Sequence, residues 1–180
     1  MSTIVHISKL DAAKRQLEMA IRLYMHNSDA VSIHTLTGAA HRILEDISLK
    51  RGKTSLIKEM LSSVRDEYRK EVELKFNKAR NFFKHADVDP EGVVEFNSES
   101  SELELWDACR MYQTLTGELP PILGVYMAWF HIHHENLLIL TPEQKQAYDH
   151  GRATVSNKDD RKEFLRVFLP IGELLYSGKS

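Results

Sequence analysis

The sequence contains a single cysteine, Cys109, among its 180 residues. One cysteine cannot form a disulfide within the chain, and the lack of a cysteine framework is typical of proteins from a reducing compartment. Nothing around Cys109 marks it as activated, and we therefore interpret it as a buried, small hydrophobic residue. The N-terminus also lacks a basic segment followed by an apolar run, which predicts no secretion signal. We expect a cytoplasmic protein.

Neither sign of charge predominates, because 24 Lys and Arg residues accompany 26 Asp and Glu residues, for a net charge of −2. This excludes a positive field over the whole molecule that could hold nucleic acid, and any contact with RNA must be local. The hydrophobic fraction of 42% and the charged fraction of 28% are average for globular proteins. Since domains usually have about 100 to 200 residues, we expect residues 1–180 to form a single domain.

One apolar run, residues 121–130, lies within a segment long enough to span a bilayer, residues 119–140. Polar residues follow the run within that segment, and such groups are costly in hydrocarbon. They are His131, His133, His134 and Glu135. We therefore expect a helix in the protein core and no membrane partner.

Signals for β-strands are also scarce, since Val93, Val94 and Phe96 are too few for a sheet. Elsewhere, apolar residues recur every three or four positions, which predicts helices. The expected helices cover about 9–27, 29–51, 54–86, 101–116, 121–140, 142–152 and 159–178. We predict an all-α protein, an up-and-down bundle of about six to seven helices.

The third predicted helix has the clearest pattern, with apolar residues from Ile57 to Ala86 at steps of three or four. Thr54 could cap its start, and the proline and glycine within residues 87–92 would end it. A group of polar residues stands at the end of this helix. They are Arg80, Asn81, Lys84 and His85.

The segment Arg-Asn-Phe-Phe-Lys-His, from Arg80 to His85, resembles the HEPN superfamily, named for higher eukaryotes and prokaryotes nucleotide-binding. The signature of that family is an arginine, often followed by asparagine, with a histidine about four to six residues later. A pair of antiparallel helices precedes the motif, and residues 8–52 have a similar pattern. The resemblance covers residues 8–90. It implies a HEPN-like front half, and we separately expect additional helices from residues 100–178 to pack on it.

The resemblance also implies metal-independent cleavage of RNA, with no metal and no cofactor, at a site shared by two subunits of a homodimer. Arg80 and His85 would be catalytic, and Asn81 and Lys84 would bind the substrate. A histidine with a pKa near neutrality can accept the proton of a ribose 2′-hydroxyl, and an arginine can stabilise the pentacovalent phosphate. Ribonucleases of this kind include toxins and defence proteins, and a degenerate relative would bind RNA without cleaving it. An antitoxin could be a further partner.

The spacing of these residues constrains how they could act together. On a continuous helix, Arg80 lies one turn from Lys84, and Asn81 lies one turn from His85. Arg80 and His85 diverge by about 140° at 3.6 residues per turn. Either the helix ends between them, or they act across a dimer.

Two alternatives remain open. In the first, Arg80 and His85 only complete a helix, near Asp87 and Asp89, and the protein is a non-catalytic helical interaction or structural protein that forms a homodimer. In the second, which the motifs favour less, a helical bundle binds a metal. Its ligands would come from His131, His133, His134 and Glu135, with His34 and His41 as additional candidates.

Overall fold

The computed structural model describes residues 3–62, 65–87, 89–137 and 141–178, and all regular structure in these ranges is helical. The prediction of an all-α bundle is therefore confirmed. In chain order, the elements are α1 (Lys9–Met25), α2 (Ala30–Lys50), α3 (Leu56–Ser62), α4 (Asp66–Phe82), α5 (Glu102–Thr116), α6 (Pro121–His133), the short 3₁₀ helix η1 (Glu135–Leu137), α7 (Pro142–Thr154) and α8 (Arg161–Ser177).

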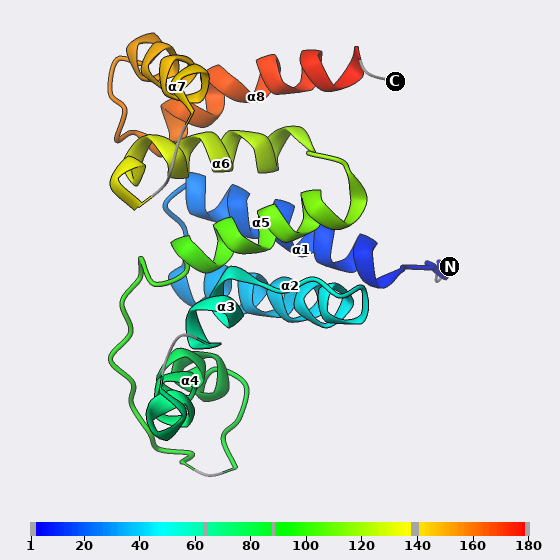
Figure 1. The fold of residues 1–180 in the computed structure, drawn as a ribbon, viewed down its shortest axis with the longest axis vertical. Helices are drawn as coiled ribbons and strands as arrows, with labels where there is room; N and C mark the ends of the chain where they lie inside the picture. The colour runs from blue at the N-terminus through cyan, green and yellow to red at the C-terminus, as the bar shows by residue number, and fades with distance from the viewer. Residues whose placement is uncertain (1–2, 63–64, 88, 138–140, 179–180) are drawn as a thin grey trace.

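The helices are stacked in layers along the long axis of the molecule (Figure 1). α1 and α2 form an antiparallel hairpin, and α5 packs against both. α6 packs between α1 and α8, and α7 packs against α6. α4 lies at one end of the stack, where it contacts α2 and α3, whereas α7 and α8 lie at the other end.

Several helices begin at the residues that the sequence predicts. The Ser8 hydroxyl accepts a hydrogen bond from the Asp11 N–H at 3.1 Å, and the Asp29 carboxylate accepts one from the Ser32 N–H at 2.7 Å. Both satisfy backbone donors that the first turn of a helix leaves free. Thr141 forms a capping box with Gln144 at the start of α7.

The core is one apolar cluster to which both halves of the chain contribute. Leu17 of α1 and Leu44 of α2 are completely buried in it, as are Leu123 and Tyr126 of α6. The long apolar run therefore forms a core helix, as predicted. This helix, α6, ends at His133 and not near residue 140, because the His134 backbone leaves the helical conformation and only the short η1 follows. No helix in the described ranges is long and apolar enough to cross a membrane. Cys109 is fully buried, and burial raises the pKa of its thiol.

The prediction of one long third helix is wrong, because α3 ends at Ser62 and α4 begins at Asp66. The Ser62 hydroxyl donates to the Glu59 carbonyl at 2.6 Å, a local hydrogen bond typical of serine at a helix end. The apolar pattern continues across this break, which is why periodicity alone predicted a single helix. One residue of that pattern, Val64, lies outside the described residues. α4 also ends at Phe82, three residues before His85.

Candidate functional site

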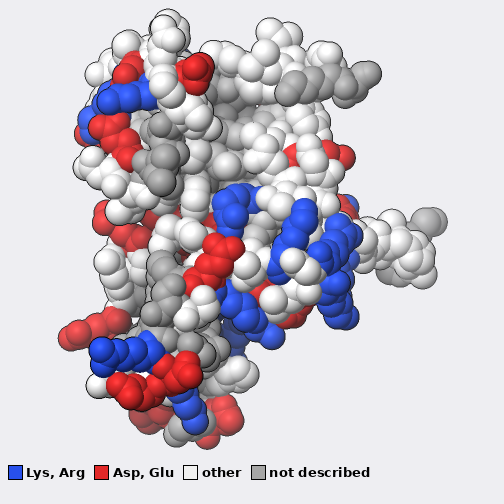
Figure 2. Space-filling view, viewed as in Figure 1, with Lys and Arg blue, Asp and Glu red and all other residues white. Residues whose placement is uncertain are grey.

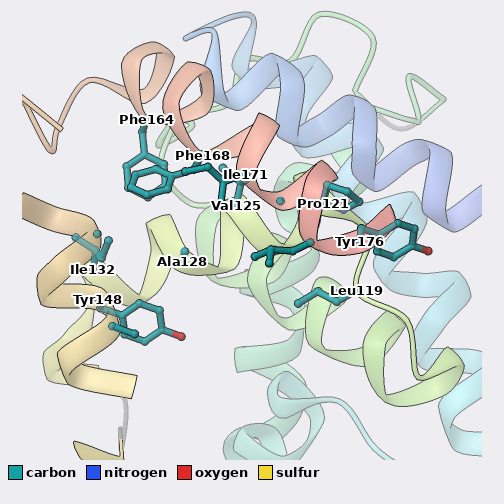
Figure 3. A pocket seen from close by; sticks show the side chains of 15 residues that line it. Leu119, Pro121, Val125, Ala128, Ile132, Tyr148, Phe164, Phe168, Ile171 and Tyr176 are labelled. Atoms are coloured by element: carbon teal, nitrogen blue, oxygen red, sulfur yellow. The ribbon is translucent and has the colours of Figure 1, made fainter. Parts of the chain in front are cut away.

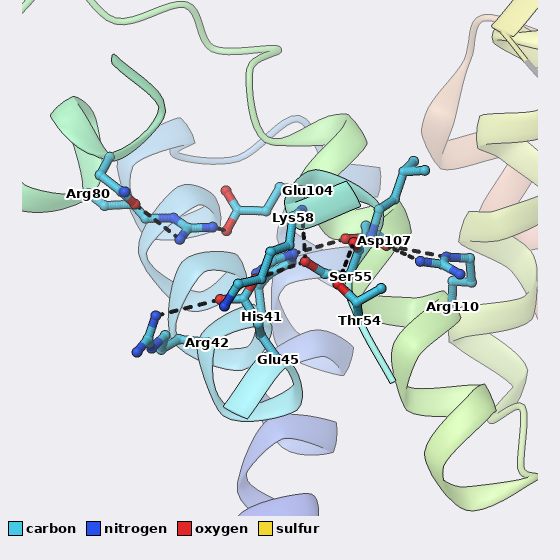
Figure 4. Close-up of polar contacts among 12 residues, drawn as sticks. His41, Arg42, Glu45, Thr54, Ser55, Lys58, Arg80, Glu104, Asp107 and Arg110 are labelled. Carbon is cyan, nitrogen blue, oxygen red and sulfur yellow. Dashed lines mark hydrogen bonds and ion pairs between the residues drawn. The ribbon is translucent and has the colours of Figure 1, made fainter. Parts of the chain in front are cut away.

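Arg80 lies in the last turn of α4 and forms an ion pair with Glu104 of α5 (Figure 4). The exposed fraction is 17% for the Arg80 side chain and 9% for that of Glu104. Burial lowers the pKa of Arg80, but an arginine in a protein stays charged at physiological pH. The pair therefore places two opposite charges in the interface between α4 and the core.

Gly38 of α2 leaves the space through which the Arg80 side chain passes. A Cβ atom at Gly38 would lie 3.1 Å from Arg80 Nε and 3.4 Å from two side-chain carbons of Arg80. Protein interiors are close-packed, and an added side chain here would have to displace the arginine. The conformation of Arg80 thus depends on a residue that is distant in the sequence.

A pocket of about 390 Å³, hereafter the basic pocket, lies between α2 and α4. Three of the residues predicted from the HEPN resemblance, Arg80, Asn81 and Lys84, line it. The other lining residues are Gly38, Arg42, Lys70, Leu74 and Asn77. Four of these side chains are cationic and two are amides, and none of the described residues that line the pocket is acidic. The pocket therefore has the chemistry of an anion site.

The four cations of the basic pocket are not equally free to bind an anion. Arg42 lies 3.5 Å from a carboxylate oxygen of Glu45 and 3.3 Å from one of Asp46. Arg80 is paired with Glu104. Lys70 and Lys84 are exposed and form no ion pair with any described residue. Within the part of the chain that the structure describes, these two lysines are therefore the lining cations without an acidic partner.

His85, the predicted catalytic histidine, does not line the basic pocket. It lies on the exposed turn that follows α4, and its backbone N–H donates to the Asn81 carbonyl at 3.1 Å. The helix ends between Arg80 and His85, which is one of the two arrangements that the spacing allows. The structure thus brings Arg80, Asn81 and Lys84 together in one pocket and leaves His85 outside it.

His34 of α2 is a neighbour of this site that the sequence analysis considered only as a metal ligand. Its Nδ1 lies 2.9 Å from the Ser101 hydroxyl, and its ring packs edge-on against Phe83 and Phe96. Burial, with smaller contributions from the charges of Arg80 and Lys84, lowers the pKa of His34 to about 4. His34 is therefore neutral at pH 7, and it could have been found only from the packing of α2, α4 and α5.

A second polar group lies deeper between α2, α3 and α5 (Figure 4). Asp107 is completely buried and accepts hydrogen bonds from His41 at 3.1 Å and from Arg110 at 2.9 Å. The Leu56 N–H at the start of α3 also donates to Asp107, at 3.2 Å. Burial would raise the pKa of Asp107, but these hydrogen bonds outweigh it and lower the pKa. This network fixes the start of α3 on the core.

The second histidine cluster is divided among separate partners. His131 Nε2 accepts from the Trp106 indole N–H at 3.0 Å, His133 lies 3.2 Å from Asp159, and His134 lies 2.8 Å from Glu102. Glu135 pairs with Arg152 at 3.2 Å. Within the described ranges, no three His, Cys, Asp or Glu side chains converge as metal ligands would. The alternative of a metal centre built from these residues therefore lacks the required geometry.

On the face drawn in Figure 2, the surface at the level of α4 carries charges of both signs, which fits a local anion site. At the level of α4, Figure 2 shows Lys and Arg side chains alternating with Asp and Glu side chains.

Comparisons with models of known protein families, with curated proteins and with solved structures found no match. The relation to the HEPN superfamily accordingly remains a proposal based on the motif.

Proposed function

We propose that this protein acts on RNA, and that the basic pocket binds a phosphate of the RNA backbone. The observation that carries this proposal is the lining of the pocket, with four cations, two amides and no acid among its described residues. Lys and Arg side chains and side-chain amides are among the groups that hydrogen-bond to nucleic-acid phosphates. The net charge of −2 is compatible with the proposal, because only a local contact is required.

The four cations would have different roles in the proposed complex. Lys70 and Lys84, which form no ion pair with a described residue, would make the first contacts with the phosphate. Asn81 would add a hydrogen bond from its amide. Arg80, held by Glu104, would support the wall of the pocket and add a permanent charge to its field.

Cleavage of the RNA is a further step that the proposal treats separately. A general base must come within hydrogen-bond reach of the ribose 2′-hydroxyl. His85 could do so from the turn after α4, or from the second subunit of a homodimer. Because Arg80 is paired with Glu104 and His85 lies outside the basic pocket, the geometry favours RNA binding over cleavage. An antitoxin partner stays a prediction.

A mixed pool of single-stranded RNA, incubated with the protein in the presence of a metal chelator, tests binding and cleavage together. We expect retention of RNA by the wild type and by His85→Ala, and weaker retention by Lys84→Ala. Products with 2′,3′-cyclic phosphate ends that disappear in His85→Ala would extend the function to metal-independent cleavage. Absence of both binding and cleavage by the wild type would reject the proposal.

The alternative, a non-catalytic helical interaction protein, is favoured by an exposed apolar face on α8. The exposed fractions there are 47% for Ile171, 74% for Leu174 and 64% for Leu175. Contiguous exposed apolar residues often mark protein contacts. Under this alternative, α8 would join two copies of the chain, and the protein would be a homodimer whether or not it binds RNA.

A further inference from the structure

A second pocket, hereafter the apolar pocket, lies at the opposite end of the molecule from α4, between α6, α7 and α8 (Figure 3). Its volume is about 370 Å³, within the range of small-molecule sites. None of the described residues that line it is charged. Its walls include Leu119, Val125, Ala128, Ile132, Phe168 and Leu175.

Three glycines, one from each helix, help to leave this space open. They are Gly124 of α6, Gly151 of α7 and Gly172 of α8. A Cβ atom would come no closer than 3.6 Å to another residue at Gly124, 3.7 Å at Gly151 and 3.4 Å at Gly172. These are ordinary van der Waals distances, so a Cβ atom would fit at each of the three positions. Close contact between helix backbones is therefore not the reason that these residues are glycines.

Two lining residues, Tyr148 and Tyr176, carry a hydroxyl, and a chain of hydrogen bonds determines the orientation of the one on Tyr148. The Trp106 indole N–H can only donate, and it donates to His131 Nε2 at 3.0 Å. Burial lowers the pKa of His131, which keeps the ring neutral, and its one proton is therefore on Nδ1. His131 Nδ1 lies 2.5 Å from the Tyr148 oxygen and must donate to it.

Because the Tyr148 oxygen accepts from His131, its own proton is available to another acceptor. Burial raises the pKa of Tyr148, and the hydroxyl keeps this proton at neutral pH. No described residue accepts it. Figure 3 shows the Tyr148 ring at one end of the apolar pocket, with its oxygen turned toward the side of Leu119. Tyr148 thus gives the pocket a hydrogen-bond donor of defined orientation, within walls that are mostly apolar.

We propose that the apolar pocket binds a small, neutral, mostly apolar molecule whose carbonyl oxygen accepts the hydrogen bond of Tyr148. The available volume suits a molecule of roughly a dozen non-hydrogen atoms, at about 30 Å³ for each water-sized group. A carboxylate would be excluded, because an unpaired charge is costly where no lining residue can compensate for it. The site is separate from the basic pocket, and the inference does not depend on RNA binding.

Titration with 2-octanone, followed by the amide NMR signals of Gly124, Gly151 and Gly172, tests this inference, with octanoate as the charged counterpart. We expect 2-octanone to shift these three signals and octanoate to bind at least about tenfold more weakly. Tyr148→Phe, which removes only the hydroxyl, should weaken 2-octanone binding about fivefold, as expected for one neutral hydrogen bond. Tyr176→Phe, at the other tyrosine of the lining, should change the affinity less than about twofold.

A blocking variant keeps the test independent of Tyr148. Ala147 is exposed and lines the pocket, and Ala147→Trp should abolish binding while leaving the helical content unchanged. Absence of shifts with 2-octanone, equal affinity in Tyr148→Phe, or tighter binding of octanoate would each overturn the inference. So would a homodimer, seen by light scattering, in which a second copy covers the pocket and prevents the shifts.

Discussion

Arg80 of α4 forms an ion pair with Glu104 of α5, in the layer where α4 meets the rest of the molecule. The same arginine lines the basic pocket. Its guanidinium therefore belongs both to the interface that holds α4 in place and to the surface proposed to bind phosphate. Substitutions around this pair should affect stability and RNA binding by different amounts, which allows the two roles to be separated.

Removal of the carboxylate by Glu104→Ala should destabilise the fold, because Arg80 would remain as a buried charge without its partner. We expect the free energy of unfolding to fall by about 3 kcal/mol, measured by urea denaturation. Glu173→Ala, which removes an exposed carboxylate from α8, should change it by less than about 0.5 kcal/mol. If Glu104→Ala lowered the free energy of unfolding by less than about 1 kcal/mol, the charge of Arg80 would be compensated by groups other than Glu104.

Gly38→Leu should also destabilise the fold, because the new side chain would occupy the space of Arg80. Overpacking of this kind costs about 1 to 3 kcal/mol, partly offset by the better helix propensity of leucine. The double variant Gly38→Leu/Arg80→Ala tests the cause in urea denaturation. Arg80→Ala should lower the free energy of unfolding less in the Gly38→Leu background than in the wild type. Equal losses in the two backgrounds would argue against a steric clash between the new leucine and Arg80.

The stability of the protein should depend on pH through His34. Its pKa of about 4 in the folded state lies below its ordinary value of 6.5, and the unfolded chain therefore binds the proton first. The contribution of neutral His34 to the free energy of unfolding is complete above pH 6.5, and it is lost as the pH falls toward 4. The expected loss over this interval is about 3 kcal/mol, since one pKa unit corresponds to about 1.4 kcal/mol.

Urea denaturation of wild type and His34→Gln between pH 7 and pH 4 measures this contribution. The variant should show a flatter pH dependence, with a residual slope from His131, whose pKa burial also lowers. His6→Gln provides a control, because His6 is exposed near the N-terminus. If the free energy of unfolding of His34→Gln changed with pH as steeply as that of the wild type, His34 would not be the source of the pH dependence.

The helices could be predicted from the sequence where the signals are local. Ser8, Asp29 and Thr141 cap helices because each lies within three residues of the N–H group that it accepts from. The break between α3 and α4 could not be predicted in this way. The hydrogen bonds of Asp107 fix the start of α3, and the apolar spacing continues across the break.

The candidate site could be predicted only in part, for a related reason. The motif drew attention to Arg80, Asn81 and Lys84, and all three line one pocket. The partners that define their surroundings, Glu104 and Arg42, come from α5 and α2, and no spacing within α4 indicates them. His34 likewise pairs with Ser101, which lies 67 residues away. Such contacts depend on how the helices pack.

The salt dependence of RNA binding tests the central claim, the phosphate site in the basic pocket, most directly. A labelled single-stranded RNA would be titrated with wild type, Lys84→Ala and Lys162→Ala, an exposed lysine of α8, at several salt concentrations. Loss of one phosphate contact should reduce the slope of log K against log salt by about 0.7 in Lys84→Ala, with no change in Lys162→Ala. Equal slopes in all three proteins, or no binding by the wild type at low salt, would contradict the account.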